Sequence, residues 1–403
     1  MNILLINHYA GSPEYGMEFR PFYMAKEWVK QGHDVLIVGG SFSHLRKKQP
    51  TLSVECIDGI KYRWIKLNEY KGNGVGRIIS MFSFVSKLYF NHNKYLDGFR
   101  PDIVIASSTY PLDIYPAHKI AEKYKAKLIY EVHDLWPLSP MEIGGYSKYH
   151  PFIWIMQQAE DYAYKYCQKV VSLLPNALDH MKEHGLTEDK FVYIPNGFDM
   201  NEWENIPPLS KSHADVINEL RGDGKFILGY AGGHAKSNAL DYLLDAMKLI
   251  KNDKIICVLV GKGQEKQRLV ERAAEEDIKN VVFLDAIPKK EIPALLNSMD
   301  ALYIGWENNP LYRFGISPNK LIDYMMSAKP IIHSVNAAND WVKENECGIS
   351  VEAENKEAIA NAIQDMSGWN KKTLEETGDR GLMFVREKLP YPVLAEKFIN
   401  KVK

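Results

Sequence analysis

A lysine and an aspartate stand three residues apart in the segment SPNKLIDYMM, which begins at Ser317. Ser317 suits an N-cap and Pro318 suits the first helical position, so these residues predict a helix that begins there. The free amides at such a helix start, that of Asn319 among them, and the ammonium of Lys320 together suit a diphosphate. One short turn further on, Asp323 can accept hydrogen bonds from a ribose diol. The segment therefore predicts a nucleotide-binding helix.

A glycine turn with a nearby lysine follows another predicted strand. The segment YAGGHAKSN places Gly232, Gly233 and Lys236 between the strand 226–230 and a helix-like stretch from Leu240. Glycines let the backbone approach an anion closely, and a lysine beside free helix amides strengthens such a site. We therefore predict a phosphate-binding loop here. The later turn VGKGQE lacks the third glycine of a dinucleotide fingerprint and fits a plain turn as well as a ligand contact.

Two loops of the first half also follow predicted strands. In HDLWP, His133 could donate or accept a proton or stabilise charge near neutral pH, and the alternative is a structural histidine that caps the strand. In HYAGSPEYG, Gly16 could let the backbone approach a phosphate or a sugar, and the alternative is an ordinary strand-to-helix turn.

One short motif resembles a metal-binding pattern. His180-Met-Lys-Glu183-His184 matches H-x-x-E-H, and both histidines would lie on one face of a helix. Gly185 ends that helix at once, and the sequence identifies no third ligand. We therefore interpret the motif as a solvated helix end and predict no metal site.

The elements that position these loops follow a regular order. Short apolar runs alternate with longer amphipathic segments, which is typical of βαβ units and parallel sheets. The expected strands are 3–6, 35–38, 103–106, 128–132, 170–173 and 191–194, then 226–230, 256–260, 281–284, 301–304, 331–333 and 349–351. Two prolines and no periodicity make 200–209 a candidate linker. The order predicts two doubly wound modules facing a central cleft, with ligands beyond the carboxyl ends of the strands.

Composition limits the class of protein. The 403 residues, 46% hydrophobic and 25% charged, fit two globular domains at roughly 100–200 residues each. Fifty Lys and Arg against 51 Asp and Glu leave a net charge of −1, so no global basic field favours a nucleic-acid partner. The four cysteines form no C-x-x-C pair, and neither a signal peptide nor a membrane-spanning run is evident. We expect a reduced, cytoplasmic protein.

Six segments, in order, resemble the retaining, nucleotide-sugar-dependent glycosyltransferases of family 4, a group that includes bacterial surface-polysaccharide enzymes. They are the glycine-bearing first loop, EVHDLWP (131–137), IPNGFD (194–199), YAGG…K…LD (230–241), LVGKGQE (259–265) and SPNKLIDYMMSAKPII (317–332). The resemblance implies an α/β fold of the GT-B type, with two Rossmann-like domains. It implies an N-terminal acceptor-side domain at 1–205, with a C-terminal helix at 386–403 crossing back to it, and a nucleotide-sugar-binding domain at 206–385.

The resemblance also implies roles for individual residues. His133 would contact the donor sugar and support charge at its anomeric centre, and Gly16 would lie near the donor phosphates. Lys320 would bind the diphosphate, and Asp323 would take the ribose hydroxyls. The nucleobase would form backbone hydrogen bonds near Ile287.

The chain departs from the family pattern at two places. Gly315 stands where many relatives carry an acidic residue, so the amides of 315–317 would take over its contact with the donor sugar. Gly233 and Asn238 stand where many relatives carry an arginine and a lysine, and Lys236 is the expected replacement.

The reaction that the resemblance implies is sugar transfer with the anomeric configuration retained. The donor would be a nucleotide sugar, with UDP favoured over GDP, and the acceptor a saccharide, often lipid-linked. No nucleophile for a double displacement stands out, which favours front-face attack. No cofactor is expected, and the lack of a D-x-D motif favours a metal-independent enzyme.

Residues 75–100 bear on the location of the protein. They combine Arg77, Lys87, Lys94 and Arg100 with many aliphatic and aromatic residues. Such a helix can lie in an anionic membrane interface, which would place the enzyme peripherally at the inner face of the cell membrane. The alternative is that its apolar residues pack on the N-terminal sheet.

Other functions fit the sequence less well. A nucleotide-sugar epimerase of the same fold would need a different arrangement of carboxylates, and a sugar phosphorylase would need a greater length. A dinucleotide oxidoreductase lacks its G-x-G-x-x-G, and a two-lobed solute-binding protein lacks a signal peptide. A nucleotide-binding or sugar-binding protein without transferase activity is the alternative from another class.

Overall fold

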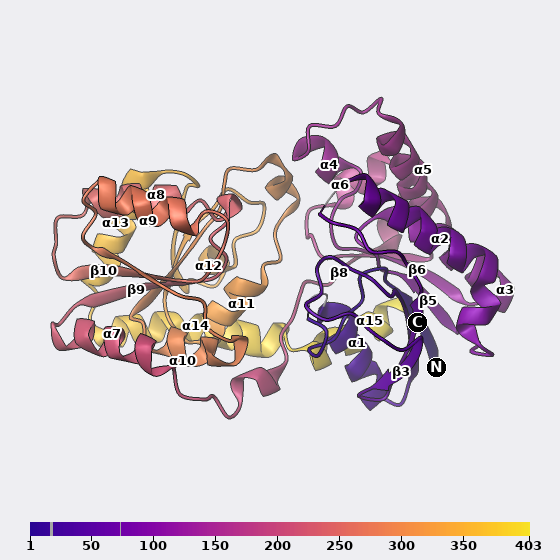
Figure 1. The fold of residues 1–403 in the computed structure, drawn as a ribbon, viewed down its shortest axis with the longest axis horizontal. Coiled ribbons are helices and arrows are strands. Elements are labelled where there is room, and N and C mark those ends of the chain that lie inside the picture. Colours follow the sequence, from indigo (N-terminus) through magenta and orange to yellow (C-terminus); the bar gives the residue numbers. More distant parts are fainter. Residues whose placement is uncertain (17–18, 73) are drawn as a thin grey trace. The chain divides into compact units, whose positions relative to one another are not determined.

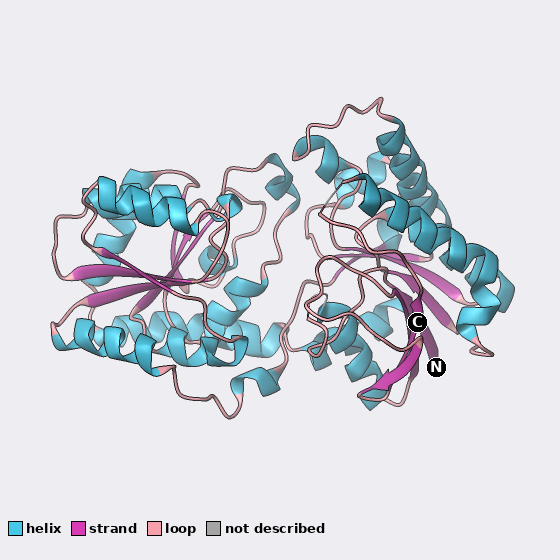
Figure 2. Ribbon diagram, in the orientation of Figure 1, coloured by secondary structure: helices cyan, strands magenta, loops and turns pink. Residues whose placement is uncertain are grey.

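The computed structural model describes residues 1–16, 19–72 and 74–403 and divides into two compact units (Figure 1). Unit 1 comprises Met1–Asn196 together with Tyr391–Lys403, and unit 2 comprises Gly197–Pro390. Each unit is a mainly parallel sheet with helices on both faces (Figure 2). The predicted α/β class and the doubly wound modules are confirmed.

Unit 1 contains a sheet of order β3-β4-β2-β1-β5-β6-β7-β8, parallel except for the pair β3–β4. Its strands are β1 (Asn2–Ile6), β2 (Asp34–Gly40), β3 (Val54–Ile57), β4 (Ile60–Ile65), β5 (Ile103–Ala106), β6 (Lys127–Val132), β7 (Lys169–Ser172) and β8 (Phe191–Tyr193). Its α-helices are α1 (Phe19–Lys30), α2 (Val75–Leu96), α3 (Ile114–Tyr124), α4 (Leu138–Glu142), α5 (Pro151–Tyr166), α6 (Leu178–Glu183) and α15 (Tyr391–Val402). The alternation of apolar strands with amphipathic helices produces this arrangement, because each helix buries its apolar stripe on the sheet.

Unit 2 contains a fully parallel sheet of order β11-β10-β9-β12-β13-β14. Its strands are β9 (Phe226–Ala231), β10 (Ile255–Val260), β11 (Val281–Leu284), β12 (Ala301–Gly305), β13 (Ile331–Ser334) and β14 (Gly348–Val351). Its α-helices are α7 (Lys211–Gly222), α8 (Leu240–Leu249), α9 (Lys266–Glu275), α10 (Ile292–Asn297), α11 (Asn319–Met326), α12 (Trp341–Glu344), α13 (Lys356–Ser367) and α14 (Lys371–Lys388). One core joins the sheet to α10, α11 and α14, and a second joins it to α8, α9 and α13.

The strand order fixes where ligands can bind in each unit. In unit 1 the strands that follow β1 are first added on one side of it, and the order then reverses so that β5 lies on its other side. In unit 2 the order reverses in the same way between β9 and β12. Loops that leave neighbouring strands at such a switch point diverge and leave room for a ligand beyond the carboxyl ends. The predicted site residues follow β1 and β6 in unit 1 and β9, β11 and β12 in unit 2.

Strands β3 and β4 were not predicted. They form an antiparallel hairpin whose turn is Asp58-Gly59, and both turn residues have positive φ. The Asp-Gly pair is a strong hairpin signal, and β3 alternates exposed and half-buried residues as an edge strand does. The signal was present in the sequence, but the hairpin does not fit a strict βαβ alternation.

The boundaries of the units differ from the expected 205/206 and 386. Residues 197–205 belong to unit 2, because Phe198 is buried in its core and its amide donates to the Leu389 carbonyl at 3.1 Å. Helix α14 runs on to Lys388, so the return to unit 1 begins only at Tyr391. Helix α15 then packs beside α1 (Figure 1), and the rings of Trp28 and Phe398 lie 5.1 Å apart.

Helix α2 bears on whether residues 75–100 contact a membrane or pack on the N-terminal sheet. Its buried side chains are Ser80, Met81, Phe84, Leu88, His92 and Leu96. Of its basic residues, Arg77 donates a hydrogen bond to the Tyr9 hydroxyl at 3.0 Å, and Lys87 donates to the Lys66 carbonyl at 2.6 Å. One face of α2 therefore packs in unit 1. The opposite face leaves Val75, Ile79 and Phe90 exposed.

Within the described residues, no helix has the length and apolar character needed to cross a bilayer.

Candidate active site

A hydrogen-bonded relay holds His133 at the carboxyl end of β6. Glu131 lies in β6 and His133 follows the last residue of that strand, and His133 Nε2 lies 3.4 Å from Glu131 Oε2. The Ser107 hydroxyl, from the loop after β5, donates to Glu131 Oε2 at 2.7 Å and lies 3.0 Å from His133 Nε2. Because Ser107 has one proton to donate, His133 Nε2–H donates to the serine oxygen. The relay orients the imidazole through its Nε2 atom.

A buried ion pair supports this relay. Arg20, in the first turn of α1, lies with its Nη2 3.0 Å from Glu131 Oε1, and both side chains are buried. The same guanidinium donates to the carbonyls of Ile194 and Pro195. Burial opposes ionisation of Glu131, but Arg20 and the contact with His133 outweigh it and hold the pKa of Glu131 below its usual range. Sequence reasoning missed Arg20, since its partner lies 111 positions away in the chain.

Gly16 lies in the loop between β1 and α1, four residues before Arg20. It is buried, and its amide donates to the Ser12 carbonyl at 2.8 Å. Because this loop follows β1, Gly16 lies beyond the carboxyl end of that strand, at the same edge of the unit 1 sheet at which His133 follows β6. Its predicted role near donor phosphates stays a prediction.

Lys320 is held by one group from β9 and one from the segment that follows it. Its ammonium donates to the Tyr230 hydroxyl at 3.0 Å and to Asn238 Oδ1 at 2.6 Å. It also lies 4.6 Å from the centre of the Tyr230 ring, in cation–π geometry. Gly232 permits this approach, because a Cβ at that position would lie 2.7 Å from Lys320 Cε. Burial lowers the pKa of Lys320 to about 7, so the neutral amine is easily reached. Sequence reasoning missed Tyr230.

Asp323 lies one turn further along α11, at a partly buried position beside the segment that precedes α7. Burial raises the pKa of Asp323 to about 7, and nearby Glu202 acts in the same direction. Lys289 and a hydrogen bond from Trp203 oppose this rise without cancelling it. The helix thus presents a cation and a carboxyl group three residues apart, and both titrate near neutral pH.

The backbone before α11 is held in place by an asparagine that sequence reasoning missed. Asn339 accepts a hydrogen bond from the Ile316 amide at 2.7 Å and donates to the Ile316 carbonyl at 3.0 Å. Gly315 is buried and has a φ of +100°, which favours glycine. Helix α11 begins at Asn319, and Pro318 rather than Ser317 is its N-cap, because Pro318 still has extended ψ. The predicted helix start was therefore one residue early.

The structure does not bring Lys236 to the Lys320 group. Lys236 lies in a short 3-10 turn with its side chain 85% exposed, 4.0 Å from Glu307. The neighbouring Gly233 instead accepts hydrogen bonds through its carbonyl from Tyr230 at 2.7 Å and from Asn238 at 2.9 Å. In this conformation Asn238, not Lys236, completes the group around Lys320. Ile287 is half-buried at the edge of the unit 2 core, in the loop after β11.

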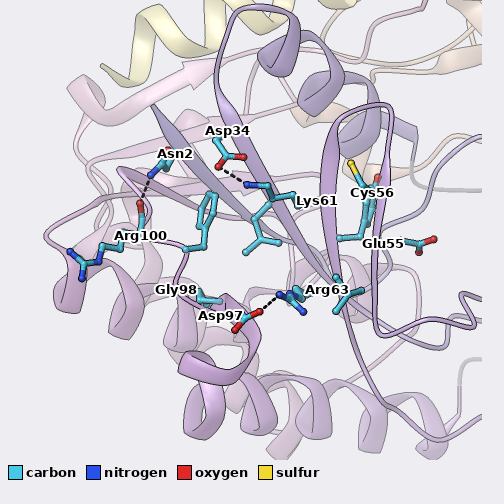
Figure 3. A pocket seen from close by; sticks show the side chains of 14 residues that line it. Asn2, Asp34, Glu55, Cys56, Lys61, Arg63, Asp97, Gly98 and Arg100 are labelled. Atoms are coloured by element: carbon cyan, nitrogen blue, oxygen red, sulfur yellow. Dashed lines mark hydrogen bonds and ion pairs between the residues drawn. The ribbon is translucent and has the colours of Figure 1, made fainter.

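A cavity of about 690 Å³ lies at the opposite end of the unit 1 sheet (Figure 3). It is lined by residues that include Asn2 and Asp34 at the starts of β1 and β2, and the ion pair of Lys61 with Asp34 lies on its wall at 2.7 Å. Amino ends of parallel strands are not where such sheets bind substrates, and no predicted site residue lines this cavity. We therefore place the candidate active site at the carboxyl ends of the strands.

The fold and these loops define the class of protein. A family model described as Glycosyltransferase Family 4 matches residues 16–202, and one described as Glycosyl transferases group 1 matches residues 225–367. The chain therefore belongs to the family 4 glycosyltransferases, with one matching model in each half of the chain. It is a glycosyltransferase with a two-domain GT-B fold, as the motifs predicted.

Individual relatives agree with this assignment. The probable glycosyltransferase WbjE of Pseudomonas aeruginosa is 23% identical over 286 residues, which cover 70% of this chain and 67% of WbjE. Among solved structures, Anabaena Alr3699/HepE in complex with UDP and glucose aligns over 100% of this chain and 99% of its own, with a TM-score of 0.67 and 15% identity. WaaG, a glycosyltransferase involved in lipopolysaccharide biosynthesis, aligns over 100% of both chains with a TM-score of 0.67 and 13% identity.

Proposed function

We propose that this glycosyltransferase moves a sugar from a UDP-sugar to a saccharide acceptor, with the anomeric configuration retained, during assembly of a cell-surface polysaccharide. The observation that carries the proposal is the start of α11, where Lys320 and Asp323 offer one cation and one carboxyl group three residues apart. A lysine suits the diphosphate and a carboxylate suits the ribose hydroxyls. The choice of uridine is supported by the UDP complex of HepE, and the surface-polysaccharide role by the involvement of WaaG in lipopolysaccharide biosynthesis.

The proposed step is front-face transfer. The bond from the anomeric carbon to the diphosphate oxygen breaks, and the acceptor oxygen bonds to that carbon on the same face. The leaving diphosphate takes the proton of the acceptor hydroxyl, and Lys320 with the first amides of α11 stabilises the charge that develops on the phosphate. His133, held by Ser107 and Glu131, supports positive charge at the anomeric centre. No cofactor takes part in the proposed transfer, which is independent of metal ions.

A binding screen followed by a turnover assay tests the proposal. Thermal melts of the full chain with UDP, GDP and ADP should show the largest stabilisation with UDP. With UDP-sugars and saccharide acceptors, UDP should then be released without added Mg²⁺ or Mn²⁺, and NMR of the product should show the anomeric configuration of the donor. A larger stabilisation by GDP would replace uridine by guanosine, and an inverted product would refute retention.

UDP affinity should be highest near pH 7. Above that pH, free Lys320 is neutral and must take up a proton to pair with the diphosphate, so the Kd rises by up to about tenfold per pH unit. Below pH 7, Asp323 is protonated and must lose a proton before it can accept ribose hydroxyls as a carboxylate, so the Kd rises again. Calorimetry from pH 5.5 to pH 8.5, on the order of one and a half units either side of 7, measures the acid limb and the alkaline limb of this pH profile of UDP affinity.

Two variants separate the limbs of this profile. Lys320→Met should weaken UDP binding by about 100-fold and remove the alkaline limb, since a charge-assisted hydrogen bond of this kind contributes roughly 1.5–3 kcal/mol. Asp323→Asn should remove the acid limb, which depends on the Asp323 carboxylate, and leave the alkaline limb in place. A profile that stays flat in the unmodified chain, or unchanged affinity in Lys320→Met, would contradict the placement of the diphosphate.

We also propose that the acceptor is lipid-linked and that the enzyme, a cytoplasmic protein, associates peripherally with the inner face of the cell membrane through α2. The exposed fractions of Val75, Ile79 and Phe90 are 71%, 62% and 75%, and these residues lie along one face of that helix. Exposed Lys94 near the end of the helix adds a positive charge that an anionic surface attracts.

Vesicle co-sedimentation checks this association. Vesicles that contain phosphatidylglycerol should bind the full chain, and the double variant Ile79→Glu/Phe90→Glu should bind about tenfold more weakly. Leu52→Glu is the matched control, since Leu52 is 61% exposed but lies outside α2. Equal binding of the double variant and the control would contradict a role for α2.

A further inference from the structure

Two histidines and a buried glutamate meet in unit 1, and none of the three belongs to the relay around His133. Glu160 lies on α5, His180 lies on α6, and His184 is the C-cap of α6. One ligand atom from each of the three side chains lies within 4.8 Å of the other two. The sequence motif offered His180, Glu183 and His184, but Glu183 is exposed, and the carboxylate comes from the neighbouring helix instead.

The distances suit a small metal ion. Histidines four residues apart on one helix face are a common zinc-binding pair. Bonds of ~2.0–2.1 Å in a tetrahedral site place ligand atoms ~3.4 Å apart. Glu160 Oε1 lies 3.7 Å from His180 Nε2, so shifts of the ligand atoms by about 1 Å, through side-chain rotation, would complete the site.

The charge of Glu160 also points to a cation. Its side chain is 1% exposed, and it accepts hydrogen bonds from the neutral groups of Tyr164 and Gln157, each at 2.8 Å. Glu131, also buried in unit 1, has the permanent charge of Arg20 beside it. Among the described residues, the basic group within ion-pair distance of Glu160 is His180 alone. A buried carboxylate is costly without a nearby cation, and a divalent ion would supply that charge.

Neighbouring groups would orient the ligands. Asp161 Oδ1 lies 3.0 Å from His184 Nδ1, and a carboxylate in that place commonly orients a ligating histidine and raises its basicity. Gln157 Nε2 lies 2.8 Å from Asp161 Oδ1 and links the two carboxylates of α5. The ligands and their supports thus form one connected group.

We propose that Glu160, His180 and His184 bind one Zn²⁺ ion that ties α6 to α5. Two imidazoles with one carboxylate favour a transition metal such as zinc over Mg²⁺ or Ca²⁺, which prefer oxygen ligands alone. Helix α6 begins shortly after the carboxyl end of β7, so the ion would fix the loop 173–177 at the functional end of the unit 1 sheet. The site is structural and plays no part in the transfer step proposed above.

Zinc calorimetry on the tag-free, chelator-stripped full chain tests the site. The unmodified chain should bind one equivalent of Zn²⁺ and should give no heat with Mg²⁺. His184→Ala and Glu160→Gln should each weaken zinc binding by at least about tenfold. Glu160→Gln keeps the size of the side chain and can still accept from Tyr164, so its fold is expected to persist.

His118→Ala is the matched control. His118 also lies beside a glutamate, with its Nε2 3.5 Å from Glu122 Oε1, but among the described residues no second histidine joins that pair. Zinc should raise the Tm of the unmodified chain and of His118→Ala, and should leave the Tm of His184→Ala unchanged. An unmodified chain that binds no zinc, or a His184→Ala or Glu160→Gln variant that binds it as tightly as the unmodified chain, would overturn the proposal.

Discussion

Replacing His133 by alanine should lower the turnover number for sugar transfer by about 10³-fold and leave UDP affinity within about twofold of the unmodified chain. The imidazole is held by Ser107 and Glu131 of unit 1, whereas Lys320 and its partners belong to unit 2. The variant should therefore lose charge stabilisation in the transition state without losing the nucleotide contacts. Release of UDP from the donor found in the binding screen measures turnover, and calorimetry with UDP measures affinity.

Ser107→Ala tests whether Ser107 positions the imidazole of His133 for the transfer step. This variant keeps the imidazole but removes the hydroxyl that lies 3.0 Å from its Nε2. A smaller loss of turnover, on the order of tenfold, together with a shifted pH profile would mark Ser107 as a positioning residue. If His133→Ala retained near-normal turnover, the alternative of a structural histidine that caps β6 would be correct.

Replacing Arg20 by methionine should destabilise unit 1 by about 3–5 kcal/mol, because it leaves the carboxylate of Glu131 buried without its cation. The guanidinium also donates to the Ile194 and Pro195 carbonyls, which lose these hydrogen bonds in the variant. For a unit of this size the loss corresponds to a fall in Tm of about 10 °C, measurable by scanning calorimetry.

The loss should depend on pH in a defined direction. The pKa of Glu131 is lower in the folded chain than its usual value of ~4.3, so the ion pair stabilises the folded state above that pH. This stabilisation decreases as the pH falls below ~4.3, because Glu131 takes up a proton in the unfolded chain while it stays ionised in the folded chain. The difference in Tm between the unmodified chain and Arg20→Met should therefore be largest at neutral pH and smaller in acid.

Lys61→Met is the matched control for the ion pair. Lys61 and Asp34 form a contact of 2.7 Å on the same sheet, but the two side chains are 53% and 43% exposed. Exposed pairs contribute roughly 0–1 kcal/mol, so this variant should melt within about 3 °C of the unmodified chain. Equal losses in Arg20→Met and Lys61→Met would show that burial does not set the strength of the Arg20 contact.

Local patterns in the sequence were sufficient for every strand except β3 and β4 and for the start of the nucleotide helix. The strand 103–106 was predicted with its observed bounds, because four consecutive apolar residues between turn signals suit a strand buried on both faces. The start of α11 was predicted to within one residue from Ser317 and Pro318, because capping preferences are properties of neighbouring residues. The hairpin β3–β4 was missed although Asp58-Gly59 marked it.

The sequence by itself determined the two doubly wound modules, the family, the loop that carries His133 and the helix that carries Lys320 and Asp323. Periodicity, caps and glycine turns act over a few residues and can be seen in the chain order. Only the tertiary structure decided which side chains meet: Arg20 with Glu131, Tyr230 with Lys320, and Glu160 with His180. It also turned Lys236 outward, away from the group that includes Asn238. Each of these outcomes depends on groups brought together by parallel strand pairing and helix packing, and sequence spacing carries no record of that geometry.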